Sequence, residues 1–205
     1  MSTPTAPRRT RPHVNPLAFT SEMTFGGFDD TKPLILDIGA YRGEFTQQLL
    51  ERFGTDYNYL VTEVRPPFTR YLNELFAKQE HVAVLGGNSS RNIRGLLEPS
   101  VQKGARIAYI FINFPDPWFK AKHHKRRVLT ERFLEDLYPL LDTDSQLIFQ
   151  TDQQVLFDQT IELIENDGRF TVEYFDQSLW GIQSHWEVQK VGEGSSIYRA
   201  CVCKL

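Results

Sequence analysis

Apolar runs typical of buried strands alternate along this chain with segments that have the spacing of amphipathic helices. The strand-like runs, rich in Ile, Val, Leu and aromatic residues, cover residues 34–38, 57–64, 81–86, 106–114 and 146–151. The helix-like segments, with apolar residues three and four positions apart, cover residues 44–53, 67–78, 130–141 and 155–166. Strands that alternate with helices join through right-handed crossovers, so the pattern predicts an α/β fold with a doubly wound, mostly parallel sheet. Two further strand-like segments, residues 169–175 and 196–205, predict an antiparallel C-terminal edge.

The length and composition of the chain suit one folded domain with a short N-terminal extension. Of its 205 residues, 40% are hydrophobic and 24% are charged, as in ordinary globular domains. The first residues differ, because Arg8, Arg9 and Arg11 lie among prolines with few apolar neighbours. Such a composition cannot bury a core of its own. We therefore expect a flexible basic arm over residues 1–30 and a folded domain over residues 31–205.

The sequence disfavours a membrane protein and a metalloprotein. No apolar run reaches the roughly 18 residues that a membrane-spanning helix needs, and the N-terminal residues lack the apolar stretch of a secretory signal. We therefore expect a cytoplasmic protein that does not enter a membrane. The two cysteines, Cys201 and Cys203, are too close in sequence for a disulfide and lack the spacing of a zinc site, so no metal site is predicted.

A basic segment stands out against the formal net charge of −3. It consists of Lys122, His123, His124, Lys125, Arg126 and Arg127. By contrast, residues 133–187 hold twelve acidic residues against one arginine. The small net charge therefore hides a positively charged segment that can bind a polyanion. Taken alone, such a run also fits a solvated loop or the start of a helix.

Glycines and polar residues follow the first three predicted strands, where ligands bind in sheets of this kind. After the first strand, Gly39 and Gly43 permit a tight turn and a close approach of the backbone to a ligand. After the second strand, the Glu63 carboxylate can accept both hydroxyls of a ribose. After the third, Asn88 can read the edge of an adenine. Each residue also suits an ordinary turn, but together they predict an adenosine-containing cofactor.

The fourth predicted strand ends in a stiff loop that carries one carboxylate. Residues 113–120 read Asn-Phe-Pro-Asp-Pro-Trp-Phe-Lys, so Asp116 lies between two prolines with aromatic rings on both sides. A carboxylate held in this way can face the reactive end of the cofactor and accept hydrogen bonds from the donor edge of a guanine. The basic segment follows at once. Phosphate-binding charge beside a base-sized aromatic site predicts an enzyme that modifies a base in a nucleic acid.

The strongest motif, Phe-Pro-Asp-Pro-Trp-Phe-Lys-Ala-Lys-His-His-Lys-Arg-Arg at residues 114–127, resembles a loop and basic run of the tRNA (guanine-N7)-methyltransferases almost residue for residue. Further matching pieces are residues 11–17 and 37–45, Glu63 with Arg65, Thr151 with Asp152, and residues 184–199. The resemblance covers nearly the whole predicted domain. It implies a Rossmann-like class I methyltransferase fold, S-adenosylmethionine as cofactor and tRNA as partner. The implied reaction is methyl transfer to N7 of a guanosine in the tRNA variable loop, at position 46.

The resemblance also implies roles for individual residues. Carried over by position, contacts to the cofactor fall on Asp37, Gly39, Gly43, Glu63, Asn88 and Asp116. Asp116 corresponds to the catalytic acid. The residues implied to hold the target nucleotide are Lys120, Asp152, Ser184, His185, Trp186 and Glu187, and the basic segment falls where the family meets tRNA. Either a monomer or a homodimer is compatible with the sequence.

Three positions depart from the pattern of the family. The middle glycine of the first loop is Tyr41, whose side chain must point away from the cofactor or it would occupy cofactor space. Asn88 replaces an aspartate. Ser184 begins a Ser-His-Trp-Glu stretch where the family has Thr-x-Tyr-Glu.

Two other functions stay open at the level of sequence. A catalytically silent tRNA-binding homologue would keep the fold and the basic segment, while Tyr41 blocks a degenerate cofactor loop. A nucleotide-dependent dehydrogenase would also use the glycine turn and Glu63. That second alternative gives Asp116 and the basic segment no role, and the turn lacks the three-glycine pattern of dinucleotide-binding loops.

Overall fold

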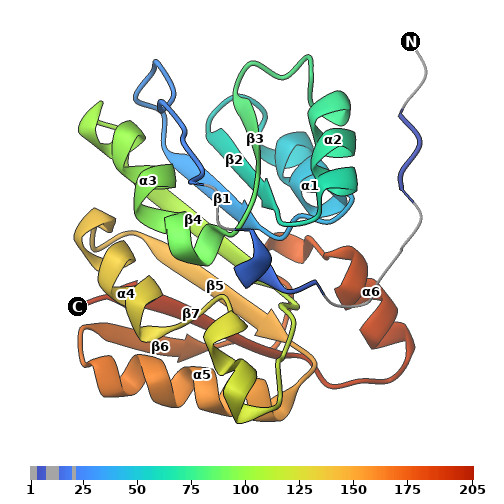
Figure 1. The fold of residues 1–205 in the computed structure, drawn as a ribbon, viewed down its shortest axis with the longest axis vertical. Helices are drawn as coiled ribbons and strands as arrows, with labels where there is room; N and C mark the ends of the chain where they lie inside the picture. Colours follow the sequence, from blue (N-terminus) through green and yellow to red (C-terminus); the bar gives the residue numbers. More distant parts are fainter. Residues whose placement is uncertain (1–3, 8–13, 20–21) are drawn as a thin grey trace.

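The structure, a computed structural model, describes residues 4–7, 14–19 and 22–205 of the chain. Arg8, Arg9 and Arg11 of the predicted basic arm lie outside the described residues. Within them, a seven-stranded sheet in the order β3-β2-β1-β4-β5-β7-β6 has helices on both faces (Figure 1). The strands are β1 Leu34–Ile38, β2 Asn58–Glu63, β3 Val82–Gly86, β4 Ile107–Asn113, β5 Gln146–Thr151, β6 Phe170–Tyr174 and β7 Tyr198–Lys204.

The described residues also form six α-helices and four short 3-10 helices. The α-helices are α1 Glu44–Phe53, α2 Pro66–Leu75, α3 Ser89–Gln102, α4 Glu131–Leu137, α5 Gln154–Asp167 and α6 His185–Gly192. The 3-10 helices are η1 Pro16–Ala18, η2 Ala121–Arg126, η3 Tyr138–Leu140 and η4 Leu179–Gly181.

The order of the strands confirms the predicted doubly wound sheet. β1 pairs in parallel with β2 on one side and with β4 on the other. The chain therefore builds β1, β2 and β3 in one direction and β4 and β5 in the opposite direction, so the strand order reverses between β1 and β4. The antiparallel C-terminal edge is confirmed as well, because β7 runs antiparallel to both β5 and β6.

The apolar runs of the sequence become strands that are covered on both faces. Leu34, Leu36 and Ile38 of β1 pack into a cluster with side chains of α3, α4 and α5. Ile35 points to the other face and packs with side chains of α1 and α2. Alternate residues of one strand thus enter two cores, which explains why the run lacks a polar face.

Two helices were not predicted from the sequence. α3 contains Gly95 and Pro99, the two residue types with the lowest helix propensity. It forms nonetheless, because Ile93, Leu96 and Leu97 are completely buried in the core. α6 has only eight residues, of which Trp186, Val188 and Val191 are the apolar ones apart from glycine, so its apolar spacing is a weak helix signal.

Residues 22–30 lie along α3. Met23 is buried, and its backbone N–H donates to Oδ1 of Asn92 over 3.1 Å. Gly27 has a φ of +79°, and a Cβ there would lie 2.9 Å from the backbone of Pro99. This close approach requires glycine. A domain boundary at residue 30 stays a prediction.

Candidate active site

A cavity of about 470 Å³ opens at the carboxyl ends of the parallel strands, where the strand order reverses. Its volume is that of a typical small-molecule site. The predicted site residues that line it are Gly39, Glu63, Asn88, Asp116, Arg126, Asp152 and Trp186. The others do not line it: Asp37, Gly43, Lys120, Ser184, His185, Glu187, and the basic segment apart from Arg126.

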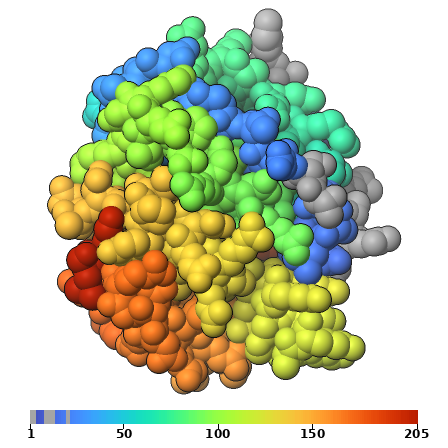
Figure 2. Space-filling model, turned by 60° about the vertical axis from the view of Figure 1, so that its left-hand side comes forward, coloured from blue at the N-terminus to red at the C-terminus, as the bar shows by residue number. Residues whose placement is uncertain are grey.

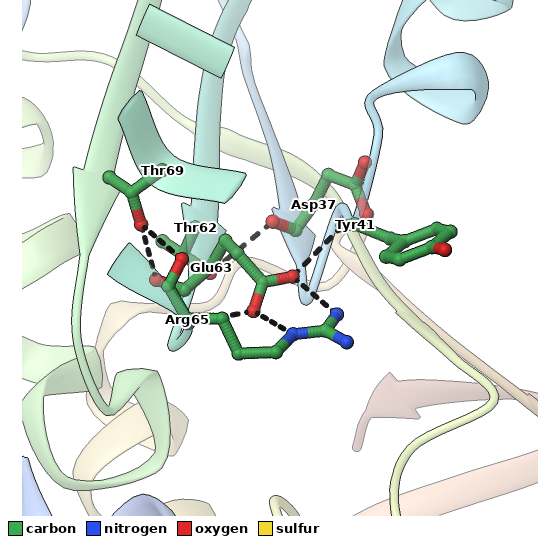
Figure 3. A network of polar contacts seen from close by, with 6 residues as sticks. All are labelled: Asp37, Tyr41, Thr62, Glu63, Arg65 and Thr69. Atoms are coloured by element: carbon green, nitrogen blue, oxygen red, sulfur yellow. Dashed lines mark hydrogen bonds and ion pairs between the residues drawn. The ribbon is translucent and has the colours of Figure 1, made fainter. Parts of the chain in front are cut away.

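Glu63 is the buried acid of the cavity wall (Figure 3). Its Oε1 accepts hydrogen bonds from the backbone N–H and the Nε–H of Arg65, both over 2.9 Å. Its Oε2 accepts from Nη2 of Arg65 over 2.9 Å and from the backbone N–H of Tyr41 over 3.1 Å. Arg65 also lines the cavity and was not predicted as a site residue. Side-chain pairing of this kind leaves no periodic signal in the sequence.

Asp37 at the end of β1 faces α1 rather than the cavity. Its Oδ2 accepts a 2.6 Å hydrogen bond from the hydroxyl of Thr46. Burial raises the pKa of Asp37 to about 6, and the nearby charge of Glu63 acts in the same direction, whereas the Thr46 bond lowers it. In this structure Asp37 links β1 to α1, and its contact with the cofactor stays a prediction.

The two glycines of the first loop have different surroundings. Gly39 has a φ of +81° and lines the cavity, and nothing lies within 4 Å of the position that a Cβ would take. A ligand can therefore approach its backbone closely. Gly43 also has a positive φ, but a Cβ there would lie 2.8 Å from Leu72, so this glycine serves packing against α2.

Tyr41 points away from the cavity. Its φ of 54° places it in the left-handed region, and its side chain is only 6% exposed. The ring packs against Phe68, His185 and Trp186, with centroid distances of 4.7, 5.5 and 5.8 Å. Tyr41 is not among the residues that line the cavity. The phenol therefore leaves the cofactor space open, as cofactor binding requires.

Asn88 lies where β3 leads into α3, and it meets the N-terminal residues. Its Nδ2 donates to the carbonyl oxygen of Pro16 over 3.1 Å. Val14 and Pro16 themselves line the cavity, as does Ser89 at the start of α3. Sequence reasoning missed these three residues, because the N-terminal residues were expected to be a tail and α3 was not recognised.

Asp116 lines the cavity from the loop that follows β4. Two residues of this loop, Phe114 and Trp118, have positive φ values of 50° and 43°. These conformations are uncommon for aromatic residues and tend to occur at functional sites. The guanidinium of Arg126 lies over the Trp118 ring, 4.9 Å from its centroid, and lines the same cavity. Arg126 thus reaches the cavity from the basic segment.

The rest of the basic segment lies outside the cavity, in and after η2. Figure 2 shows these yellow-green residues projecting at the lower right, below the blue N-terminal residues. Lys122 and Lys125 are exposed. Arg127 instead donates to the carbonyl of Pro117 over 3.0 Å and to Gln159 over 2.9 Å, and burial lowers its pKa. The segment therefore combines exposed cations with an arginine that anchors the loop.

The basic residues also act on the histidine among them. Desolvation lowers the pKa of His123, and the positive charges of Arg126 and Lys122 lower it further. Its ring lies edge-on to Trp118, 5.8 Å between centroids.

α6 brings a cation and an aromatic ring to the cavity beside Asp152. Lys190 lies 3.6 Å from the Asp152 carboxylate and 2.9 Å from that of Glu193. Gln153 donates to Asp152 over 2.7 Å. Trp186, Gln189 and Lys190 all line the cavity. Lys190 was not predicted as a site residue, because α6 was not recognised as a helix.

Ser184 and Glu187 hold α6 in place in this structure. Ser184 caps the helix by accepting the backbone N–H of Glu187 over 3.2 Å. The buried Glu187 carboxylate accepts from Arg199 over 2.6 Å, from Ser178 over 2.5 Å and from Gln150 over 3.1 Å. The Ser-x-x-Glu spacing is a capping-box signal from which the helix could have been predicted.

Among the described residues, no three His, Cys, Asp or Glu side chains are grouped so that they could hold a metal ion. None of the helices in the same part of the chain has the length and apolar character needed to span a membrane.

The chain is similar in sequence to known proteins. A family model described as "Putative methyltransferase" matches residues 31–194. A tRNA (guanine-N(7)-)-methyltransferase of Synechococcus sp. (strain JA-3-3Ab) is 31% identical over 82% of this chain and 71% of its own length. The protein of the same name from Thermosynechococcus vestitus is 29% identical over 93% of this chain and 92% of its own.

Two solved structures that share the fold carry the name methyltransferase. A methyltransferase from Pyrococcus furiosus matches 86% of this chain and 77% of its own, with a TM-score of 0.56 and 14% identity. The human methyltransferase 10 domain containing protein matches 87% of this chain and 76% of its own, with a TM-score of 0.53 and 15% identity. At these identities the likeness concerns the fold.

Proposed function

Because this chain belongs to the tRNA (guanine-N(7)-)-methyltransferase family, we propose that it transfers a methyl group from S-adenosylmethionine to N7 of a guanosine in tRNA. The observation that carries this function is the cavity at the reversal of strand order. Glu63, Gly39 and Asp116 all line it, together with Arg126 of the basic segment, whose Lys122 and Lys125 are exposed.

The residues of the cavity fit the cofactor. The open space beside Gly39 lets a part of the cofactor approach the protein backbone closely. The buried carboxylate of Glu63 suits the hydroxyls of the ribose. Asn88 supplies an amide for the adenine. When bound, S-adenosylmethionine supplies a methyl group made electrophilic by its sulfonium. The protein then has to orient the target base and exclude water.

Positioning is the main task of the protein, since guanine N7 carries a free lone pair and no proton has to be removed before attack. Holding the two reactants in line lowers the barrier by roughly 7 to 11 kcal/mol relative to a random encounter. In this proposal Asp116 and Asp152, which both line the cavity, accept hydrogen bonds from the guanine and stabilise the positive charge that develops on it.

The finer features of the reaction are part of the same proposal. We assign the target to the variable-loop guanosine on the resemblance of residues 114–127 to the family's loop. Lys122 and Lys125 are exposed and suit the phosphates outside the cavity, while Arg126 suits the phosphate of the target nucleotide. The substrate being tRNA, we assign the protein to the cytoplasm.

The test is incubation of the purified protein with unmodified tRNA and methyl-labelled S-adenosylmethionine, followed by mapping of the modified nucleotide. Label at N7 of the variable-loop guanosine is the expected result. Label on another nucleotide would overturn the assignment of position. Binding of tRNA without methyl transfer would identify a catalytically silent homologue.

A further inference from the structure

The hydrogen-bonding capacity of the Glu63 carboxylate is fully used in this structure. An ionised carboxylate offers about four lone-pair sites. Backbone N–H groups of Tyr41 and Arg65 fill two of them, and the Nε–H and Nη2–H groups of the Arg65 side chain fill the other two. The hydroxyls of a ribose therefore cannot bind Glu63 while the Arg65 side chain remains in place.

We propose that the Arg65 guanidinium occupies the place of the cofactor's ribose on Glu63, and that the ribose hydroxyls displace it when the cofactor binds. The inference rests on the proposed function, because it needs a cofactor that contains adenosine. Two donors of the Arg65 side chain leave and two hydroxyl donors enter. The two backbone N–H groups keep the carboxylate oriented during the exchange (Figure 3).

Two aromatic rings support the guanidinium beside Glu63. The Arg65 Cζ lies 5.1 Å from the centroid of the Tyr41 ring and 4.6 Å from that of Phe68. A cation over an aromatic face is stabilised even when it loses a carboxylate partner. The side chain that replaces the family's glycine at position 41 thus acquires a role, which is to hold Arg65 near the cofactor site.

The surroundings of Arg65 keep its guanidinium protonated. Burial lowers its pKa, but the hydrogen bonds and charge of Glu63, together with the charge of Asp116, raise it overall. Arg65 and Asp116 line the same cavity, so a displaced guanidinium has a second carboxylate nearby. Arg65 therefore remains a cation on either side of the exchange.

The exchange makes Arg65 a positioning residue that sets cofactor affinity. When only a fraction of the molecules has Glu63 available, the apparent dissociation constant rises in inverse proportion to that fraction. Removal of the Arg65 side chain should consequently tighten cofactor binding, which is the opposite of the effect expected for a residue that holds the ligand.

The experiment compares Arg65→Met with wild type by calorimetric titration, using S-adenosylmethionine and S-adenosylhomocysteine separately. The dissociation constant of each should fall about ten-fold, because both carry the same ribose. Without ligand, Arg65→Met should melt at a lower temperature than wild type, since Glu63 is then buried without a cation. Arg42→Met is the matched control, because the Arg42 guanidinium also lies 5.1 Å from the Tyr41 centroid and does not bond Glu63.

Three results would overturn the inference: weaker binding of both ligands, unchanged binding of both, or a gain for S-adenosylmethionine alone. The last would indicate charge repulsion of the sulfonium. If Arg65→Met does not fold, Arg65→Lys should bind both ligands more tightly than wild type, because lysine cannot make the paired contact; equal or weaker binding would count against the exchange. Failure of wild type to bind S-adenosylmethionine would defeat the proposed function instead.

Discussion

Asp116 is fixed by its backbone neighbours. Prolines flank it in sequence, and the left-handed conformations of Phe114 and Trp118 turn the chain on either side. Packing of the surrounding residues keeps the backbone in these strained conformations, which tend to occur where a functional side chain is held in one orientation.

Replacing Asp116 by Asn should lower the rate of methyl transfer about 100-fold or more, since a neutral amide stabilises the developing positive charge less than a carboxylate. Binding of tRNA should be largely preserved, because the proposed phosphate contacts belong to other residues. Single-turnover kinetics with saturating tRNA measures the step. The exposed Asp144 provides the control, because Asp144→Asn removes the same charge far from the cavity. A variant of Asp116 with wild-type turnover would refute its catalytic role.

Asp37 should make the stability of the fold depend on pH. Its pKa is about 6 in the fold against an ordinary value of 3.8, so the folded state binds a proton that the unfolded state has lost. The proton that Asp37 binds in the folded state stabilises the fold by roughly 3 kcal/mol at most. This stabilisation is complete below the pKa of the unfolded state, 3.8, and is lost as the pH rises through about 6.

Urea unfolding of wild type and Asp37→Asn at pH values from about 4 to about 7 checks this expectation. The wild type should lose more free energy of unfolding than the variant over that interval, because the amide does not titrate. Parallel curves would show that Asp37 does not carry the shift.

At the scale of elements, η2 carries exposed lysines that we propose to bind tRNA, and Arg127 directly after it holds the loop. Changing Lys122 and Lys125 together to Ala should weaken tRNA binding and reduce the slope of log K against log salt by about two, because both cations are exposed. Arg127→Ala should instead lower the melting temperature, since it loses the contacts to Pro117 and Gln159. Filter binding over a salt series distinguishes the double lysine variant from Arg127→Ala. An unaltered slope in the lysine variant would contradict the proposal that Lys122 and Lys125 bind tRNA.

α6 depends on a buried ion pair for its position. Glu187→Gln should cost about 3 kcal/mol of unfolding free energy, because Arg199 is left as a buried charge without its partner. The double variant Glu187→Gln, Arg199→Met should regain much of that loss. The exposed pair of Arg94 and Glu98 is the comparison, and Glu98→Gln should cost less than about 1 kcal/mol. Equal losses in the two pairs, measured by urea unfolding, would rule out this role.

The elements that the sequence revealed are those whose burial follows a simple period. Apolar runs such as residues 34–38 and 146–151 became strands with core on both faces. α3 was not predicted, because Gly95 and Pro99 disfavour a helix and only tertiary packing stabilises it. α6 was not predicted either, because its helix signal lies in the cap formed by Ser184 rather than in apolar spacing.

For the whole molecule, the sequence predicted the location of the site better than its internal contacts. Strand ends and loop motifs placed Glu63, Asn88 and Asp116 on one cavity, because parallel strands end at one edge of the sheet. The pairing of Arg65 with Glu63 could not be predicted in this way. It depends on how two side chains are oriented after folding, and no spacing in the sequence records that.

The path of β7 has a consequence for biosynthesis. It is made after β6, yet it lies between β5 and β6 in the sheet. While the ribosome is still adding residues 198–204, the edge of β5 has no neighbour and β6 has no sheet to join. The ribosome must therefore add residues 198–204 before the sheet can close. A nascent polypeptide halted earlier presents an open strand edge to chaperones or to other copies of itself.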